Sequence, residues 1–415
     1  MWERLFDRMV RTIIRFGTLH VTLPDGHRVT AGDGTGEPVG IRLTDPALPR
    51  RIIATPDLAV GEGYMDGTVI IEGDDLRGFH ALAMRNLGTT PGIDLIPGLW
   101  WQRPLALSRH ALRRWHQWNP ASRARANVAH HYDLSAKLYD LFLDADKQYS
   151  CAYFTDPSMT LDEAQEAKKR HIAGKLMIEP GMRVLDIGCG WGGLALTLAR
   201  DYGARVVGVT LSEEQHKIAT HRAREAGLAD RAEFRLTDYR NITETFDRIV
   251  SVGMFEHVGV PHYDEYFAAV SDRLAPDGVA LVHTIGRMRP PGITSPWIEK
   301  YIFPGGYIPA LSEMVAPIER RQLYVTDIEI WRLHYAETLK HWYDRFVRSE
   351  DHARALYDER FCRMWRYYLA AAEMTFRYNR QCVFQVQLAH RQDAVPLSRD
   401  YLYLGGAEAH AQAAE

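Results

Sequence analysis

The spacing of apolar and polar positions divides this chain of 415 residues into two parts of different character. In the first part, residues 1–16 carry apolar side chains at helical spacing, and Pro24-Asp25-Gly26 separates two short alternating runs as a hairpin turn would. Strands of this part are expected at 19–23, 27–30, 39–43 and 68–71. Residues 1–85 are therefore predicted to form a small α+β unit.

From about Asn127 onward, apolar strands alternate with amphipathic helices. The box Thr160-Leu161-Asp162-Glu163 is a helix-capping signal and predicts a helix that reaches about Leu176. Strand–helix alternation of this kind is typical of a parallel, doubly wound α/β sheet. Strands are expected at 183–187, 205–209, 233–237, 246–252, 279–285, 324–330 and 382–388, with two helices before the last of them.

Two stretches depart from this alternation. Residues 287–322 contain Pro290-Pro291 and Pro296-Trp297, and an insertion of this length is expected to cover an active site. Residues 86–125 form a linker in which the stretch 109–125 holds five arginines, two tryptophans and no acid. This basic stretch is either a solvated helix that packs its tryptophans on a neighbouring domain or a surface that meets anionic lipid headgroups.

Composition narrows the class of protein. With 46% hydrophobic residues, 25% charged residues and a net charge of −3, the chain has the make-up of a globular protein and no overall bias toward nucleic acid. The four cysteines lie far apart, which argues against a zinc site or a disulfide framework and favours a reducing cytoplasm. No apolar run reaches the ~18 residues that span a bilayer, so any membrane contact is expected to be peripheral.

The stretch from Val184 to Gly192 indicates a nucleotide-type cofactor. It runs as a buried strand, breaks into glycines and then begins a helix, and glycines allow the backbone to approach a ligand closely. Thr210-Leu211 ends the next strand without the acid that grips an NAD ribose, which argues against a dinucleotide. Asp186 and Asp238 would instead favour a cationic ligand, so adenosylmethionine is the predicted cofactor.

Several ordered stretches then carry a family resemblance. From Asn127 to about Leu388 the chain resembles the bacterial cyclopropane-fatty-acyl-phospholipid synthases and their mycolic-acid relatives. The residues that carry this resemblance are His130-His131-Tyr132-Asp133-Leu134, Gln148 to Phe154, Leu185 to Gly193, Gly208 to Ser212, Val252 to Gly259 and His283-Thr284-Ile285-Gly286. The N-terminal unit is similar to the accessory domain of the longer, phospholipid-acting members.

The resemblance implies a seven-stranded methyltransferase sheet and transfer of a methyl group to a cis double bond of an acyl chain. It also implies a bicarbonate ion and a homodimer formed through the N-terminal region. The predicted cofactor pocket consists of Tyr149, Ser150, Asp186, Gly188, Gly190, Thr210, Leu211, Gln215, Asp238 and Tyr239. The predicted bicarbonate site consists of Cys151, Glu256, His283, the backbone of Ile285, and Tyr335. No metal site is expected.

These residue types suit the implied chemistry. An alkene needs alignment with the methyl donor rather than an attacking serine or cysteine, and the carbocation that forms must lose a proton to close the ring. Bound bicarbonate would take that proton as a general base. Taken singly, Cys151 could be a buried packing residue, Glu256 a helix cap and Tyr335 part of the core. Cys189 is interpreted as packing, and no function is suggested for Cys362 or Cys382.

Three other functions remain open. The nearest is a related fatty-acyl C-methyltransferase that gives a methylene- or methyl-branched chain or a methylated precursor of another modified fatty acid. A non-catalytic lipid-binding protein and a nucleic-acid methyltransferase are the other two. The predicted domains are an N-terminal accessory lipid-interaction domain with the basic linker at 1–125, the catalytic domain at 126–395 and a tail at 396–415. The predicted location is the cytoplasm, peripheral at the inner face of the membrane, where the unsaturated phospholipid acyl chains lie.

Overall fold

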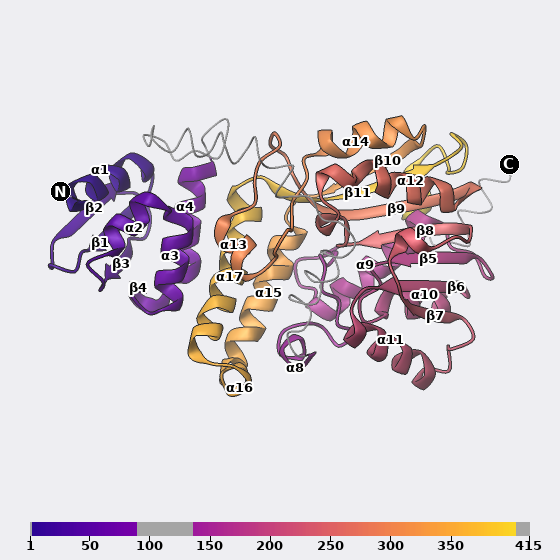
Figure 1. Cartoon of the computed structure of the whole chain (residues 1–415), viewed down its shortest axis with the longest axis horizontal. Coiled ribbons are helices and arrows are strands. Elements are labelled where there is room, and N and C mark those ends of the chain that lie inside the picture. The colour runs from indigo at the N-terminus through magenta and orange to yellow at the C-terminus, as the bar shows by residue number, and fades with distance from the viewer. Residues whose placement is uncertain (1, 89–135, 404–415) are drawn as a thin grey trace. The chain divides into compact units, whose positions relative to one another are not determined.

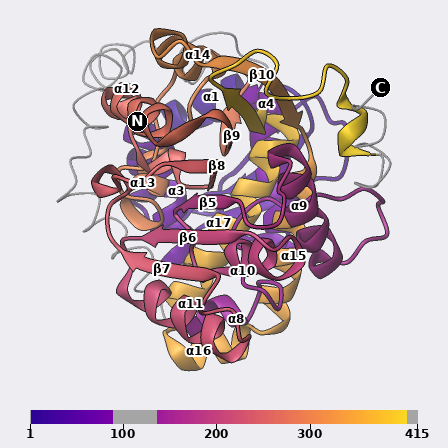
Figure 2. The same ribbon diagram turned by 90° about the vertical axis from the view of Figure 1, so that its right-hand side faces the viewer.

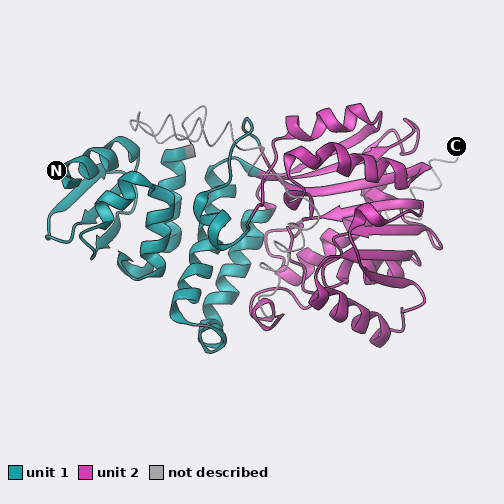
Figure 3. Ribbon diagram, viewed as in Figure 1, with its two compact units in different colours: residues 1–116, 288–304, 335–381 teal, residues 117–287, 305–334, 382–415 magenta. Residues whose placement is uncertain are grey.

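The computed structural model describes residues 2–88 and 136–403 (Figure 1). The chain divides into two compact units (Figure 3). Unit 1 combines residues 1–116, 288–304 and 335–381, and unit 2 combines residues 117–287, 305–334 and 382–415. The basic stretch 109–125 and most of the predicted tail lie outside the described residues.

Unit 1 contains a four-stranded sheet in the order β2-β1-β3-β4. Its strands are β1 (Thr18–Thr22), β2 (Arg28–Gly32), β3 (Val39–Leu43) and β4 (Val69–Ile71). β1 is antiparallel to β2 and parallel to β3, while β3 is antiparallel to β4. All four strands were predicted within one or two residues, because in sequence each is an alternating or short apolar run between turn residues.

Helices make up the rest of unit 1, and most of them were not predicted. Helix α1 (Trp2–Ile13) agrees with the predicted spacing. The others are α2 (Leu48–Ala54), α3 (Pro56–Met65), α4 (Leu76–Gly88), α13 (Pro296–Tyr301), α15 (His334–Arg348), α16 (Glu350–Leu356) and α17 (Glu359–Tyr378), with a short 3₁₀ turn η1 (Glu72–Asp74). Three helices thus stand where two were expected, because Tyr357 has a non-helical backbone and Asp358 caps α17 by accepting a hydrogen bond from the amide of Phe361.

Part of the predicted insertion belongs to unit 1. Helix α13 packs on α3, where a side chain at Gly61 would lie 2.4 Å from the ring of Trp297. Ser295 caps α13 and donates a hydrogen bond of 2.6 Å to Asp57. The rest of the insertion, with helix α14 (Leu311–Arg320), belongs to unit 2. That the insertion covers an active site stays a prediction.

Unit 2 contains a seven-stranded sheet in the order β10-β11-β9-β8-β5-β6-β7 (Figure 2). Its strands are β5 (Arg183–Ile187), β6 (Arg205–Thr210), β7 (Ala232–Leu236), β8 (Phe246–Val252), β9 (Leu274–Arg287), β10 (Tyr324–Trp331) and β11 (Gln381–Ala389). Neighbours among β5 to β9 run parallel, and β10 is antiparallel to β11. The predicted α/β class with a seven-stranded, doubly wound sheet and a small N-terminal domain is confirmed.

Helices cover both faces of this sheet, because successive residues of a strand point to opposite faces. Val184 of β5 joins an apolar cluster with α9 (Leu161–Leu176), α10 (Gly193–Asp201) and α11 (Glu213–Glu225). Leu185 joins a second cluster with α12 (Tyr263–Arg273) and α14. Figure 2 shows α9 and α10 on one side of the strands and α12 on the other. The short elements are α8 (Ala136–Asp140), η2 (Tyr239–Asn241), η3 (Phe255–His257), η4 (Val260–His262) and η5 (Arg399–Leu402).

The four cysteines are buried and free of disulfides. Cys189 belongs to the apolar cluster of β5 and α10, which agrees with its interpretation as packing. None of the helices in 2–88 and 136–403 is long and apolar enough to cross a membrane. The same residues hold no group of three or more histidine, cysteine or acidic side chains arranged to bind a metal.

Candidate active site

A pocket opens at the carboxyl ends of β5, β6 and β8, where open α/β sheets bind their ligands. The glycine loop after β5 forms one wall. Gly188, Gly190 and Gly192 all have positive φ, at 82°, 54° and 84°, which glycine adopts at little cost. The amide groups of Gly188 and Cys189 donate to the carbonyl of Val209, at 2.9 and 3.1 Å, and tie the loop to β6.

The glycines serve different purposes. A Cβ atom at Gly192 would lie 2.7 Å from the Phe234 ring, so this position needs glycine for packing. A Cβ atom at Gly190 would meet nothing within 4 Å, although Gly190 lines the pocket. The open space at Gly190 is therefore available to a ligand.

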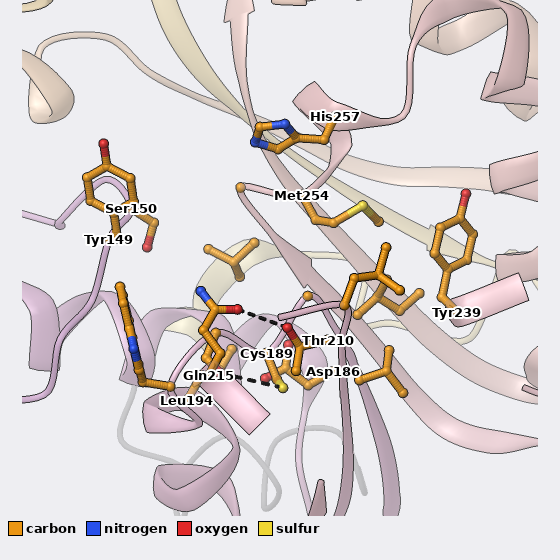
Figure 4. Close-up of a pocket in the computed structure, with 18 of the residues that line it drawn as sticks. Tyr149, Ser150, Asp186, Cys189, Leu194, Thr210, Gln215, Tyr239, Met254 and His257 are labelled. Atoms are coloured by element: carbon orange, nitrogen blue, oxygen red, sulfur yellow. Dashed lines mark hydrogen bonds between the residues drawn. The ribbon is translucent and has the colours of Figure 1, made fainter. Parts of the chain in front are cut away.

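All ten residues predicted for the cofactor line this one pocket. Asp186, Cys189, Thr210 and Gln215 lie together at its base, with Met254 and His257 above them (Figure 4). Tyr149 and Ser150 stand on the left of this view and Tyr239 on the right. The pocket is also lined by residues that sequence reasoning did not select, among them Lys147, Gln148, Trp191, Leu194, Arg240, Met254, His257 and His262.

The two acidic residues of the pocket differ in environment. Asp186 is 2% exposed, and its Oδ2 atom has no hydrogen-bond partner among the described residues. Burial raises the pKa of Asp186 to about 7, against the opposing effect of the Lys168 charge. Asp238 instead accepts from the Arg240 side chain at both oxygens, at 2.8 and 2.6 Å. Asp186 is thus the carboxyl group that lacks a counter-charge in contact with it.

Thr210 and Gln215 are fixed by the start of α11. Ser212 caps this helix by accepting from the amide of Gln215, at 3.2 Å. The Thr210 hydroxyl donates to Gln215 Oε1 at 2.9 Å, a bond drawn in Figure 4. A strand end and the next helix start therefore hold both predicted cofactor residues in place.

Glu256 and Ile285 meet at the ends of β8 and β9. Glu256 lies in the 3₁₀ turn η3, is 8% exposed, and accepts a hydrogen bond of 2.7 Å from the amide of Ile285. Burial raises the pKa of Glu256 to about 7. The predicted donor at Ile285 is therefore engaged by Glu256 itself, so a bound anion would share or displace this bond.

His283 stands on β9 beside the same turn, because its carbonyl accepts from the amide of Gly253 at 2.9 Å. Burial lowers the pKa of His283 well below its ordinary value, so the ring is neutral. Its Nδ1 atom lies 3.0 Å from Nε2 of Gln385 on β11. When Gln385 donates this bond, the proton of the imidazole sits on Nε2.

Cys151 and Tyr335 complete the predicted set. Cys151 is fully buried, and its Sγ donates to the carbonyl of Ala152 at 3.3 Å. Tyr335 stands in the first turn of α15 in unit 1, where its ring packs on Trp342 and Phe376. Its position beside the other members of the set stays a prediction.

Sequence reasoning missed Lys168 and Gln165 of α9. Both are almost fully buried, and both bind the segment 148–150 that supplies the pocket wall. The sequence did contain a signal for them. Gln165 and Lys168 lie three residues apart, at the spacing of one helix face, and they fall on the inward face of a helix whose start was predicted.

Comparison with known proteins decides the family. The family model for mycolic acid cyclopropane synthetase matches residues 120–386, and a domain family of unknown function matches residues 3–87. The chain belongs to the mycolic acid cyclopropane synthetase family.

Three relatives are similar over long stretches. The cyclopropane-fatty-acyl-phospholipid synthase of Escherichia coli (strain K12) is 40% identical over 82% of this chain and 85% of its own length. The tuberculostearic acid methyltransferase UfaA1 of Mycobacterium tuberculosis is 36% identical over 91% of this chain and 89% of its own. The structure of the mycolic acid cyclopropane synthase CmaA1 complexed with SAH and CTAB has a TM-score of 0.62 and 34% identity, covering 66% of this chain and 99% of its own.

Membership confirms the predicted enzyme class, an adenosylmethionine-dependent methyltransferase. It also confirms the predicted relationship to cyclopropane synthases. Both cyclopropane synthases and fatty acid methyltransferases occur among the relatives, which is consistent with the predicted alternative.

Proposed function

We propose that this chain is a cyclopropane-fatty-acyl-phospholipid synthase, which adds a methylene group to the cis double bond of an unsaturated phospholipid acyl chain. The observation that carries the proposal is the buried group formed by Glu256, the Ile285 amide and neutral His283. Glu256 lies between the pocket residues Met254 and His257 in sequence, and Ile285 and His283 stand near the end of β9. A water-excluded acceptor group beside a methyl-donor pocket suits a reaction that ends in removal of a proton.

The pocket fits adenosylmethionine on two counts. Asp186 Oδ2 is a buried acceptor without a hydrogen-bond partner among the described residues, which suits an ammonium or hydroxyl donor. The open space at Gly190 admits a ligand against the backbone. Adenosylmethionine would supply an electrophilic methyl group. The ten pocket residues would orient it, because a substitution on carbon needs donor and acceptor in line.

The group around Glu256 fits bicarbonate in the same way. Glu256 Oε2 has no hydrogen-bond partner among the residues that the structure describes, and a carboxyl group whose pKa is raised to about 7 tolerates a neighbouring anion by sharing a proton. Neutral His283, with its proton on Nε2, would donate to a second anion oxygen. Cys151 and Tyr335 are proposed to complete the site, and bound bicarbonate would supply the base for ring closure.

Lipid analysis tests the proposal directly. The full chain is expressed in a host rich in monounsaturated phospholipids, and the fatty-acid methyl esters are examined before and after mild hydrogenation. We expect a gain of one CH₂ in a product that takes up no hydrogen, as a cyclopropane does. A product that gains one CH₂ and then takes up hydrogen at the same carbon is methylene-branched and would replace the proposed reaction with the alternative one.

We further propose that the N-terminal region acts at the inner membrane face and forms a homodimer. The similarity to a phospholipid-acting relative over 82% of the chain supports a role at the bilayer. Removing residues before Asn127 is a poor test, because α3 and α4 pack on α17 within unit 1 and their loss would expose that helix.

Substitution within the full chain is cleaner. We expect glutamine in place of the arginines of 109–125 to weaken binding to anionic vesicles, with the largest difference at low salt. Replacing five exposed arginines of unit 2 is the matched control, namely Arg200, Arg205, Arg224, Arg231 and Arg391. Equal vesicle binding by both variants would contradict lipid binding by the stretch 109–125 and favour its other interpretation, a solvated helix. Light scattering of the full chain reports the dimer.

A further inference from the structure

The inward face of α9 carries an unusual set of side chains. Gln165, Lys168, Ile172 and Lys175 follow one another at helical spacing and are 0%, 1%, 0% and 0% exposed. Three of these four are polar or charged, whereas the buried face of a helix is ordinarily apolar. A lysine is rarely buried to this extent without a carboxylate partner, so each of the two lysines requires a physical reason.

Lys175 has such a partner and Lys168 does not. Lys175 forms ion pairs with Asp327 and Glu329, at 3.3 and 2.7 Å. Among the described residues, Lys168 forms no ion pair. Its Nζ donates to two neutral oxygens, Gln148 Oε1 at 2.6 Å and Ser150 Oγ at 2.7 Å. Lys168 therefore brings a charge into the interior mainly to hold these two side chains.

Gln165 reinforces the same attachment. Its Nε2 donates to the carbonyls of Gln148 and Ser150, at 3.1 and 3.0 Å. Helix α9 thus binds both the backbone and the side chains of the segment 148–150. This segment carries Tyr149 and Ser150 into the cofactor pocket, and its next residue is Cys151 of the proposed bicarbonate site.

The charge of Lys168 reaches both sites. Burial lowers the pKa of Lys168 to about 8. The Asp144 carboxylate opposes this effect most strongly, Asp146 and Cys151 oppose it further, and the neighbouring Lys169 charge adds to it. Lys168 in turn lowers the pKa of Asp186 in the pocket and of His283 on β9. One buried cation is therefore coupled to a cofactor residue and to a member of the proposed anion site.

We propose that Lys168 is a positioning residue that holds the segment 148–151 and makes cofactor binding and anion binding depend on one buried charge. The part that concerns the anion rests on the proposed function, while the part that concerns the cofactor rests on membership of the methyltransferase family. Loss of the Lys168 proton would leave an amine with two N–H groups, so both hydrogen bonds to the segment would lose their charge assistance, and the positive charge that favours a nearby anion would be gone.

The test compares Lys168→Met with Lys175→Met in the full chain. Both changes remove a buried lysine from the same face of α9, and Lys175→Met also breaks two ion pairs, so it reports a loss of stability that is unrelated to the segment 148–150. We expect Lys168→Met to weaken binding of adenosylhomocysteine, measured by calorimetry, by about tenfold or more, as the loss of charged hydrogen bonds to the pocket wall requires. We expect Lys175→Met to leave that affinity close to that of the unchanged chain.

A pH profile separates positioning from mere structural support. In the unchanged chain, affinity for adenosylhomocysteine is expected to fall as pH rises through about 8, where Lys168 loses its proton. Lys168→Met should lack this fall, while Lys175→Met should keep it. Affinity of the unchanged chain that is constant from pH 7 to pH 9 would overturn the proposal, and this measurement stands even when neither variant folds.

A second readout separates this proposal from the proposed function. Added bicarbonate should restore more activity to Lys168→Met than to Lys175→Met, because both charges act on His283 but only Lys168 also binds the segment that leads into Cys151. A branched lipid product together with the expected calorimetric result would refute the proposed function and leave the cofactor role of Lys168 intact. A cyclopropane product together with unchanged binding of adenosylhomocysteine by Lys168→Met would support the proposed function and refute the cofactor role of Lys168.

Discussion

Alanine at Gly190 separates the two purposes of the glycine loop. Gly190 has a φ of 54° and lines the pocket, and an added Cβ would meet no atom within 4 Å. Gly227, in the turn after α11, has a φ of 67° and equally open surroundings, but it does not line the pocket. Gly190→Ala and Gly227→Ala therefore share the backbone cost and differ only in what the new methyl group faces.

The magnitudes follow from this difference. A left-handed backbone costs an alanine about 1–2 kcal/mol, so both variants should lose a similar free energy of unfolding. In Gly190→Ala the methyl group also occupies space intended for the cofactor, and overpacking of this kind costs about 1–3 kcal/mol. The dissociation constant for adenosylhomocysteine should then rise by about 5- to 150-fold in Gly190→Ala only.

Calorimetry and urea unfolding test this expectation on the two purified variants and the unchanged chain. We expect equal shifts in stability and unequal shifts in affinity. Equal affinities for Gly190→Ala, Gly227→Ala and the unchanged chain would refute the inference that the cofactor approaches the backbone at Gly190.

Three further outcomes are expected. Glu256→Gln should lower activity by about 100-fold or more while adenosylmethionine affinity stays nearly constant, and an equal loss of both would assign Glu256 to the cofactor pocket instead. The pKa of Asp186 is raised to about 7, so the folded chain loses stability as pH rises from about 4 to 7. Asp186→Asn lacks this loss, and urea unfolding should show it to be similar in stability to the unchanged chain near pH 4 and more stable by up to about 4 kcal/mol at pH 8. A stability difference between the two chains that does not change with pH would contradict the raised pKa. Thr160→Ala should cost about 1 kcal/mol of unfolding free energy, because Thr160 and Glu163 exchange hydrogen bonds at the start of α9, and Ser158→Ala in the exposed turn before it serves as control.

Local signals located the regular elements of unit 2. The strand predicted at 183–187 matches β5, because its residues point alternately into two apolar clusters and a glycine loop ends it. The capping box at Thr160 gave the start of α9 for a reason that is also local. Helix α3 was missed because Gly61 and Gly63 contradict a helix in sequence, and the reason for Gly61 is the Trp297 ring that lies far along the chain.

The functional residues divide in the same way. The family resemblance was sufficient to select ten residues that line the pocket, and the sheet then brings them to one edge because the carboxyl ends of parallel strands meet there. The partners of these residues could not be read from the motifs. Arg240 occupies both oxygens of Asp238, and the Ile285 amide donates to Glu256, and neither bond has a signature in sequence.

The sequence by itself determined the fold class, the methyl donor and the family, since these follow from the periodicity of apolar positions and from short motifs. Only the tertiary structure decided which charges are buried and which are paired. Burial depends on atoms supplied by distant segments, and it is burial that raises the pKa of Asp186 and Glu256 and makes Lys168 an internal cation. The same lysine in an exposed helix would be an ordinary solvated charge.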